Sequence, residues 1–233
     1  MKYPNLREEK KLWRKGYKRV AGLDEAGRGP LAGPVVASAT IIKISNFKFQ
    51  IPKPLKEVKD SKQLTPKKRE EFYKILTKGA PSKIGRVVGG WRPQIEWGIG
   101  RVSEKVIDKI NILEATKLAM VKAVKKLKRK PDFLILDGNF ILPAKALAKA
   151  GINKSITQKS IVKADEKVFS CALASILAKV TRDRIMQRYH RKFPRYGFDK
   201  HKGYPTKFHR KMLKKYGHSI IHRLTFAPVK KMI

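Results

Sequence analysis

A pair of adjacent carboxylates after an apolar segment near the N-terminus constrains the fold of this chain more than any other feature. Residues 19–23 (RVAGL) predict a buried strand, and residues 24–30 (DEAGRGP) add Asp24, Glu25 and a glycine-arginine-glycine turn. Adjacent side chains of a strand point to opposite faces, so each acid needs its own partner. A buried carboxylate is costly unless it is paired or bound to a metal ion. The segment therefore predicts half of a metal site beside a turn whose backbone can approach a ligand closely.

The overall charge makes these acids more informative, because the chain has few of them. The 233 residues include 56 Lys+Arg and 18 Asp+Glu, and the formal net charge of +38 is spread along the whole length. Such a charge favours a nucleic-acid partner, because neutralising phosphates releases counterions. A solvated, lysine-rich surface of a heat-adapted protein is the alternative explanation. Membrane-surface binding would need an amphipathic terminal anchor, and the sequence shows none.

The single cysteine, Cys171, rules out an internal disulfide and favours a reducing compartment. Its apolar neighbours predict a packed thiol in preference to a nucleophile. The longest apolar run, around residues 168–178, is too short to span a bilayer, and residues 1–11 lack a signal-peptide core. We therefore predict a cytoplasmic protein that does not associate with membranes.

Strand and helix patterns alternate after an opening hairpin, which predicts an α/β fold with a mixed sheet and helices packed on it. The expected strands are residues 17–23, 33–42, 83–89, 133–136 and 155–162. The expected helices are residues 6–13, 65–76, 111–128 and 166–190, with residues 44–62 as a loop and residues 93–103 unassigned. We expect three parts, namely a charged lead-in over residues 1–16, a main domain over 17–192 and a basic helical appendage over 193–233.

Two further acids lie at the ends of apolar elements. Asp137 follows the strand at residues 133–136, and Asp165 precedes the long helix. Acids at such ends can converge with Asp24 and Glu25 above one sheet. Hard oxygen ligands suit Mg²⁺ or Mn²⁺. Together with the basic surface, this set predicts metal-assisted hydrolysis of phosphodiesters.

Each acid also has a purely structural interpretation. Asp137 and the glycine after it form an ordinary turn dipeptide, and Asp165 is well placed to cap the helix that follows it. Either acid of the first pair can form an ion pair with Arg28. If the acids have no shared function, all of these independent interpretations must be correct at the same time. A single shared site explains the acids together and is therefore favoured.

Three other patterns suggest different chemistry. The glycines that begin at Gly27 are spaced one residue off a dinucleotide-binding motif, and a strand-like segment follows them where that motif needs a helix. His218 and His222 lie four residues apart, which leaves zinc as an alternative to solvated or phosphate-facing histidines. Tyr204 lies where aromatic and basic residues alternate, which suits stacking on bases or sugars, and packing in the core is the alternative.

The chain resembles the type 2 ribonucleases H, the ribonuclease HII family. The matching segments are residues 22–30 (GLDEAGRGP), 33–36 (GPVV), 59–64 (KDSKQL), 111–116 (NILEAT), 136–138 (LDG), 163–165 (KAD), 174–183 (ASILAKVTRD), 201–206 (HKGYPT) and 222–229 (HRLTFAPV). They run in order from about residue 17 to residue 230. Ala164 departs from the glycine expected between the lysine and the acid. Arg28 and the short lead-in distinguish the chain from the related type 3 enzymes.

The resemblance implies a ribonuclease H-like mixed β-sheet flanked by helices, with a small C-terminal helical part, and makes residues 17–192 the catalytic domain. It also implies roles for single residues. The catalytic acids, which hold two divalent ions (Mg²⁺ or Mn²⁺), would be Asp24, Glu25, Asp137 and Asp165. Contacts to the ribonucleotide at the junction would come from Gly27, Arg28 and Gly29, and Tyr204 would stack on the sugar of the next deoxynucleotide.

The activity that the resemblance implies is that of an endoribonuclease. It would hydrolyse the RNA strand of RNA–DNA hybrids and nick duplex DNA on the 5′ side of single embedded ribonucleotides, leaving 3′-hydroxyl and 5′-phosphate ends. Its partners would be these two nucleic acids, and we expect a monomer with no obligate protein partner. Residues 230–233 show no clear sliding-clamp-binding peptide. The alternative is a non-catalytic basic nucleic-acid-binding protein, which explains the charge but not the acids.

Overall fold

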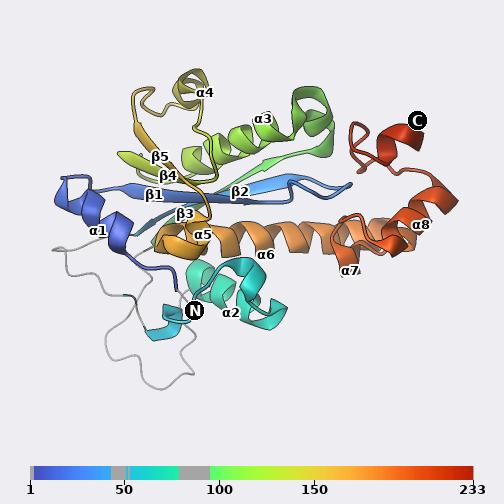
Figure 1. Ribbon diagram of the computed structural model, residues 1–233, viewed down its shortest axis with the longest axis horizontal. Coiled ribbons are helices and arrows are strands. Elements are labelled where there is room, and N and C mark those ends of the chain that lie inside the picture. The colour runs from blue at the N-terminus through green and yellow to red at the C-terminus, as the bar shows by residue number, and fades with distance from the viewer. Residues whose placement is uncertain (1–2, 43–50, 52, 79–94, 233) are drawn as a thin grey trace.

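A five-stranded mixed sheet lies at the centre of the protein (Figure 1). The computed structural model describes residues 3–42, 51, 53–78 and 95–232. The strands are β1 (Val20–Ala26), β2 (Val35–Ile42), β3 (Ile95–Val102), β4 (Phe133–Asp137) and β5 (Thr157–Ile161), in the spatial order β3-β2-β1-β4-β5. β1 pairs antiparallel with β2 and parallel with β4. The predicted opening hairpin and mixed sheet are therefore confirmed.

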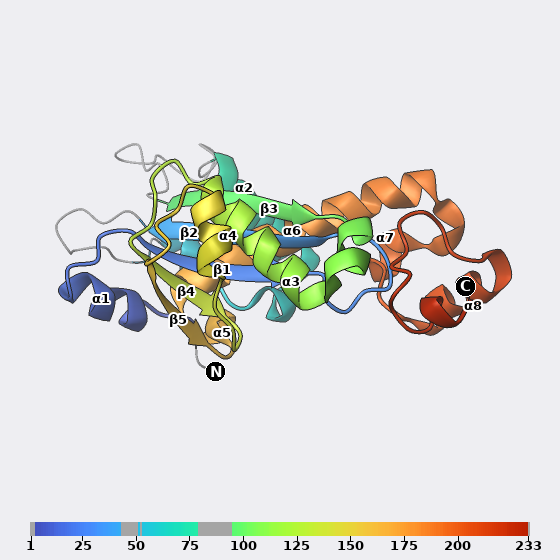
Figure 2. The same ribbon diagram turned by 90° about the horizontal axis from the view of Figure 1, so that it is seen from above.

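Helices cover both faces of this sheet (Figures 1 and 2). One face carries α3 (Glu104–Lys125) and α4 (Ala144–Lys149), and the other carries α5 (Ala164–Lys167) and α6 (Phe169–Lys192), with α2 (Pro66–Lys78) packed on α6. The remaining helices are α1 (Arg7–Arg14), α7 (Phe198–His201) and α8 (Lys207–Tyr216), and short 3₁₀ turns cover Lys53–Leu55, Ser61–Gln63, Pro194–Tyr196 and Val229–Met232. None of the helices within the described residues combines the length and the apolar character that a bilayer crossing needs.

The central strands are apolar because both of their faces are buried. Along β1, Val20 packs into the cluster under α6, whereas Ala21 and Leu23 pack into the cluster under α3. This alternation directs Asp24 toward the face that α6 covers and Glu25 toward the opposite face. The continuous apolar run before the acids is therefore what a strand between two layers of helices requires.

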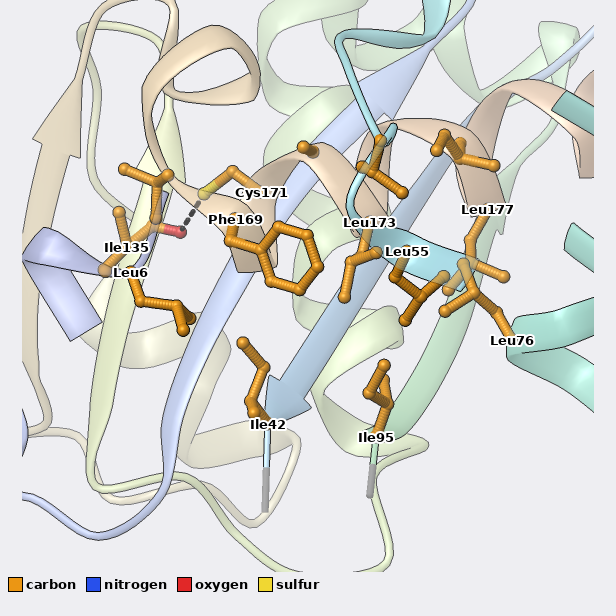
Figure 3. Packing of buried hydrophobic residues seen from close by; sticks show 14 of the residues in the cluster. Leu6, Ile42, Leu55, Leu76, Ile95, Ile135, Phe169, Cys171, Leu173 and Leu177 are labelled. Atoms are coloured by element: carbon orange, nitrogen blue, oxygen red, sulfur yellow. Dashed lines mark hydrogen bonds between the residues drawn. The ribbon is translucent and has the colours of Figure 1, made fainter. Parts of the chain in front are cut away.

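The cluster under α6 is closely packed and contains the single cysteine (Figure 3). Phe169, Leu173 and Leu177 of α6 lie in this cluster together with residues of α2 and of the sheet. The thiol of Cys171 donates a hydrogen bond of 3.7 Å to the carbonyl of Ile135 in β4. Burial raises the pKa of this thiol well above its usual value. The prediction of a packed thiol is confirmed.

Two elements differ from the sequence-based expectation, and a third expectation lies outside the described residues. The unassigned segment forms β3, whose glycines weaken its strand pattern. A Cβ at Gly100 would lie 1.9 Å from the carbonyl oxygen of Ala119, so α3 can approach this strand only where side chains are missing. α3 consists of two helical segments that meet at Asn111, where the backbone turns to φ 63°. The side-chain oxygen of Asn111 accepts the amides of Leu113 and Glu114 at 2.9 and 3.1 Å, so the expected helix starts there, and the segment before Asn111 was not expected. The expected strand at residues 83–89 is not among the described residues.

The N-terminal helix is anchored to the start of α6. Leu12 and Trp13 of α1 are buried in the cluster under α6. Glu9 is also buried, and its Oε1 accepts hydrogen bonds from the amide and the hydroxyl of Ser170 at 2.8 and 2.9 Å. Burial raises the pKa of Glu9 to about 7. Helix α1 thus belongs to the packed structure, and the proposed division into a lead-in and a main domain stays a prediction.

The C-terminal residues are joined to the loop between β1 and β2. The amide of Leu31 donates to the carbonyl of Gly203, and the amide of Gly33 donates to the carbonyl of Ile221, both at 2.8 Å. The amide of Arg223 donates in turn to the carbonyl of Leu31 at 2.8 Å. These bonds link segments far apart in sequence, and they fix the loop that follows the two acids of β1.

Replacing Glu9 with glutamine should make the stability less dependent on pH. The pKa of this acid is higher in the folded chain than in the unfolded chain, so its stabilising contribution is complete below about pH 4.5 and is lost as the pH rises through about 7. Glutamine keeps the acceptor and removes the charge. We expect the free energy of unfolding at about pH 8 to increase by about 1–3 kcal/mol. Urea unfolding at several pH values tests this, with the exposed Glu71→Gln as the control; parallel pH curves for wild type and Glu9→Gln would contradict it.

Candidate metal centre and ribose-sensing turn

Three aspartates from separate elements meet on the face of the sheet that α6 covers. Asp24 lies in β1, Asp137 ends β4 and Asp165 lies in α5, and each offers an oxygen within 4.8 Å of the other two. β1 and β4 are parallel neighbours in which Leu23 is opposite Leu136, so the next residues of the two strands lie side by side. The structure therefore brings together three of the four predicted acids, and their catalytic roles stay predictions.

Short backbone contacts hold two of these carboxylates in place. Oδ1 of Asp24 accepts the amide of Glu25 at 2.7 Å, and Oδ1 of Asp137 accepts the amide of Ala164 at 2.7 Å. Ala164, the residue that departs from the family pattern, is fully buried and supplies this bond through its backbone. The start of α5 is thereby attached to the end of β4.

Asp165 does not serve as the cap of the long helix, contrary to its structural interpretation. Val168 occupies the N-cap position of α6 and offers no side-chain hydrogen bond, while Glu9 of α1 bonds the amide of Ser170 in the first turn. Asp165 instead faces Lys62, whose Nζ lies 3.5 Å from Oδ2. Its side chain is therefore available to the cluster of aspartates.

The electrostatics of the cluster favour a cation. Burial raises the pKa of Asp24 well above its usual value, and repulsion from the neighbouring acids raises it further. Burial raises the pKa of Asp165 to about 6, with repulsion from Asp137 and Asp60 next in importance. Several oxygens that repel one another at this spacing form the hard donor set that Mg²⁺ and Mn²⁺ prefer. The residues present therefore fit a divalent metal ion.

Glu25 lies beside the three aspartates and outside their group. It points to the other side of β1, yet it lines the same cavity as Asp24 and Asp137. Oε1 accepts from Arg28 at 3.4 Å, which is the ion pair considered as a structural interpretation, and Oε2 is buried without a partner among the described residues. Burial raises the pKa of Glu25 to about 7 despite the arginine. The unpartnered oxygen is a further place where a cation fits.

The glycine-arginine-glycine turn and the predicted tyrosine line this cavity, whose volume is about 460 Å³. Gly27 has φ +99°, and a Cβ there would lie 2.0 Å from Nε of Arg182, so this position requires glycine. A Cβ at Gly29 would have Cε1 of Tyr204 as its nearest neighbour, at 3.8 Å. Tyr204 is 42% exposed, so the alternative of a core tyrosine is wrong.

Several polar residues of the site were not assigned a role from the sequence. Asp60 caps the 3₁₀ turn at Ser61–Gln63 by accepting the amide of Lys62 at 3.0 Å. The hydroxyl of Ser61 bonds that of Ser175 in α6 at 2.7 Å, and Arg69 of α2 donates to the carbonyl of Ser61 at 2.7 Å. The KDSKQL segment was part of the family resemblance, and this run of polar residues was the available signal.

The histidine pair considered for zinc, His218 and His222, is not assembled as a metal site, because His218 is exposed and His222 is buried among other partners. His222 bonds His209 through the two Nε2 atoms at 3.0 Å, and its Nδ1 accepts the amide of Ser219 at 2.9 Å. Burial lowers the pKa of His222 to about 3 and that of His209 to about 4. Within the described part of the chain, the aspartates form the one group of three or more His, Cys, Asp or Glu residues that is arranged for a metal.

The fold and this site define a class of protein, the nucleases with a ribonuclease H-like fold. A solved structure of ribonuclease H2 from Pyrococcus horikoshii OT3 is similar, with a TM-score of 0.66 and 32% sequence identity, covering 92% of this chain and 96% of that chain. The ribonuclease HII of Archaeoglobus fulgidus, solved in a complex with PCNA, gives a TM-score of 0.65 and 26% identity, covering 89% of this chain and 95% of that chain.

The sequence comparisons narrow the class to a family. The family model for ribonuclease HII matches residues 21–229. The ribonuclease HII of Chlamydia trachomatis serovar A is 44% identical over 233 residues, covering 98% of this chain and 93% of that protein. The chain belongs to the ribonuclease HII family and is a metal-dependent nuclease, which confirms the family resemblance. The alternative of a non-catalytic basic binding protein is thereby set aside.

Replacing Asp137 with asparagine should stabilise the metal-free chain and remove most of the stabilisation that a bound metal ion provides. Burial and mutual repulsion disfavour the ionised forms of the clustered acids, which raises their pKa values and destabilises the metal-free fold near pH 7. Removing one charge should raise the metal-free melting temperature by roughly 2–8 °C. Mg²⁺ or Mn²⁺ should stabilise the wild type through binding to the folded state, and the variant much less.

Thermal unfolding with and without each metal ion measures both effects. Glu57→Gln removes one negative charge at an exposed position and serves as the charge-matched control. Metal ions should raise its melting temperature as much as that of the wild type. A metal-induced rise of equal size in Asp137→Asn would place the bound ion elsewhere.

Proposed function

We propose that this protein is an endoribonuclease that hydrolyses the RNA strand of RNA–DNA hybrids and nicks duplex DNA on the 5′ side of embedded ribonucleotides. The products carry 3′-hydroxyl and 5′-phosphate ends. The observation that supports this proposal most is that Asp24, Glu25 and Asp137 line one cavity together with the glycine-arginine-glycine turn and Tyr204, while Asp165 is grouped with the other two aspartates. Chemistry on a phosphodiester and recognition of a ribose can then occur side by side.

Asp24, Asp137 and Asp165, with Glu25 beside them, are the residues that would hold two Mg²⁺ or Mn²⁺ ions. When bound, such ions activate water and stabilise the leaving oxygen of a phosphodiester. The chain orients the acids for this role through the amide of Ala164, which fixes Asp137. Burial of Asp24, which is 4% exposed, keeps bulk water from competing for its oxygens.

Selectivity for a ribonucleotide has to come from its 2′-hydroxyl, because that group distinguishes RNA from DNA. The turn at Gly27 to Gly29 presents bare backbone to the cavity, so its amides can reach the sugar. The exposed ring of Tyr204 lies next to Gly29 and would stack on the sugar of the following deoxynucleotide. These two features would together read a ribose followed by a deoxyribose.

Basic side chains around the cavity would position the duplex through its phosphates without reading the sequence. Lys62, Arg69 and Lys179 line the cavity with the acids. The net charge of +38 supplies a general attraction for the polyanion. Its substrates would be RNA–DNA hybrids and ribonucleotide-containing duplex DNA, and we expect the chain to act on them as a monomer in the cytoplasm.

The direct test of this function is a nicking assay on a DNA duplex that carries one ribonucleotide. With Mg²⁺ or Mn²⁺ the wild type should cut once, on the 5′ side of the ribonucleotide, and a denaturing gel with end-labelled strands shows the position and the ends. Asp137→Asn should lose nicking and keep duplex binding, measured by fluorescence anisotropy. Binding without nicking by the wild type, or full activity in the variant, would refute the proposal.

Replacing Tyr204 with alanine should reduce cleavage at single ribonucleotides by about tenfold, because stacking on an aromatic ring is lost. Tyr204→Phe keeps the ring and should retain most of the activity. Tyr216→Ala removes another exposed tyrosine from α8 and is the matched control. Rates measured on the same single-ribonucleotide duplex decide the matter, and an unchanged rate in Tyr204→Ala would remove this residue from the site.

A further inference from the structure

A buried arginine from the C-terminal part holds the carbonyl groups of the glycine-arginine-glycine turn. Arg223 is fully buried. Its Nη2 donates to the carbonyl of Gly27 at 2.6 Å and its Nη1 to that of Arg28 at 2.8 Å. Nε and Nη2 also donate to the carbonyl of Gly33, at 3.0 and 2.8 Å. The guanidinium thus bonds the turn directly, across 195 and 196 residues of sequence.

Within the described residues this arginine forms no close ion pair, and the acids Glu104 and Asp108 act on its charge only from a longer distance. None of the ion pairs among the described residues includes Arg223. Burial lowers its pKa to about 9. A buried charge destabilises the fold unless hydrogen bonds satisfy it, and here every bond goes to a backbone carbonyl. An apolar side chain would leave these backbone carbonyls without this donor. The hydrogen bonds to the turn are therefore the feature that explains an arginine.

Because of the geometry of the peptide bond, the hydrogen bonds to these carbonyls also fix the direction of two backbone N–H groups. In a trans peptide the C=O and the N–H of one unit point in opposite directions. The carbonyl of Gly27 shares its unit with the amide of Arg28, and the carbonyl of Arg28 shares its unit with the amide of Gly29. With both carbonyls drawn toward Arg223, both N–H groups point away from it. Neither has an intramolecular acceptor within the described residues, and both residues line the cavity of the acids.

A second buried arginine provides a comparison. Arg182 of α6 donates to the carbonyls of Pro34, Lys202 and Ala32 at 3.0, 3.0 and 3.1 Å. None of these carbonyls belongs to the turn. Although Arg182 packs against Gly27, only Arg223 bonds the two peptide units whose amides face the cavity.

We infer that Arg223 is the positioning residue that sets the turn for recognition of the ribose, and so determines how strongly the enzyme prefers a ribonucleotide over a deoxyribonucleotide. This inference rests on the proposed role of the turn. Arg223 itself does not line the cavity, so it acts through the amides of Arg28 and Gly29. Losing the bonds to the carbonyls would let these amides turn away, while the phosphate contacts of the cavity would remain.

The test measures discrimination separately from cleavage. In the Asp137→Asn background, which is expected not to cut, fluorescence anisotropy gives the dissociation constants for a duplex with one ribonucleotide and for the same duplex made of DNA alone. The dissociation constant for the all-DNA duplex divided by that for the ribonucleotide duplex is a ratio that reports ribose recognition. Adding Arg223→Lys should lower this ratio by about tenfold, the effect of losing one or two net hydrogen bonds, and should leave the affinity for the all-DNA duplex within about twofold.

The control variant separates positioning from general loss of stability. Val229→Ala removes packing from the buried C-terminal cluster, which contains no residue of the turn, so it should lower the melting temperature and keep the ratio. In Arg223→Ala, low concentrations of guanidinium chloride should occupy the space of the missing group and restore the ratio, whereas equal sodium chloride should not. Unfolding curves show which variants are folded at the assay temperature.

The outcomes distinguish this inference from the proposed function. If the Asp137→Asn protein with native Arg223 binds both duplexes equally, the turn does not recognise ribose and both ideas fail. If that protein discriminates and Arg223→Lys discriminates equally well, the inference alone is overturned. Should the Arg223 variants not fold, the amide proton shifts of Arg28 and Gly29 in the Asp137→Asn protein decide: they should move with the ribonucleotide duplex and not with the all-DNA duplex. Equal shifts would refute both the proposed role of the turn and the inference that rests on it.

Discussion

The burial of several like charges on one central strand and its neighbour is the constraint on which the rest of the structure depends. Asp24 is 4% exposed near the end of a strand whose preceding residues are packed between two layers of helices. Burial and the adjacent acids both raise its pKa, so the metal-free fold carries an electrostatic penalty there. The helices on both faces have to supply enough apolar packing to offset this penalty. The long buried stretch of α6 against β1 and β2 is where that packing lies.

The distribution of positive charge follows from the same constraint. A chain with a net charge of +38 could neutralise the acids of the site with lysine or arginine. Among the described residues, however, only Lys62 and Arg28 form ion pairs with these acids, and both side chains are exposed. Exposed ion pairs contribute little stability and are easily exchanged. The two deeply buried guanidinium groups, those of Arg182 and Arg223, bond backbone carbonyls instead. The acids therefore keep their oxygens free for a cation of higher charge.

Local patterns predicted much of the fold, because the signals for those elements lie within a few residues. The apolar runs before Asp24 and Asp137 predicted β1 and β4, and Thr65 with the proline after it predicted the start of α2. β3 was not predicted because its glycines serve the approach of α3, which is a tertiary contact. Asn111 was predicted as a helix start and does begin the second segment of α3, whereas the helical segment before it was not predicted.

The candidate site was predictable only in part, for a physical reason. The acids are identifiable because carboxylates after apolar strands are unusual in so basic a chain. The bonds from Arg223 to the turn could not be inferred, because an arginine among 56 basic residues carries no local mark of burial. Their partners lie about 195 residues away, and only the folded topology brings them together.

The arrangement of the turn also clarifies what the arginine within it does. The side chain of Arg28 is 44% exposed and reaches Glu25 at 3.4 Å, a weak contact that cannot fix a backbone. Its carbonyl, in contrast, is bonded by a buried guanidinium at 2.8 Å, and charge-assisted hydrogen bonds of this kind are the stronger ones. The conformation of the turn therefore depends on Arg223 and on the glycine at position 27, which φ +99° requires. The side chain of Arg28 remains free to exchange Glu25 for a phosphate, while its amide keeps a fixed direction.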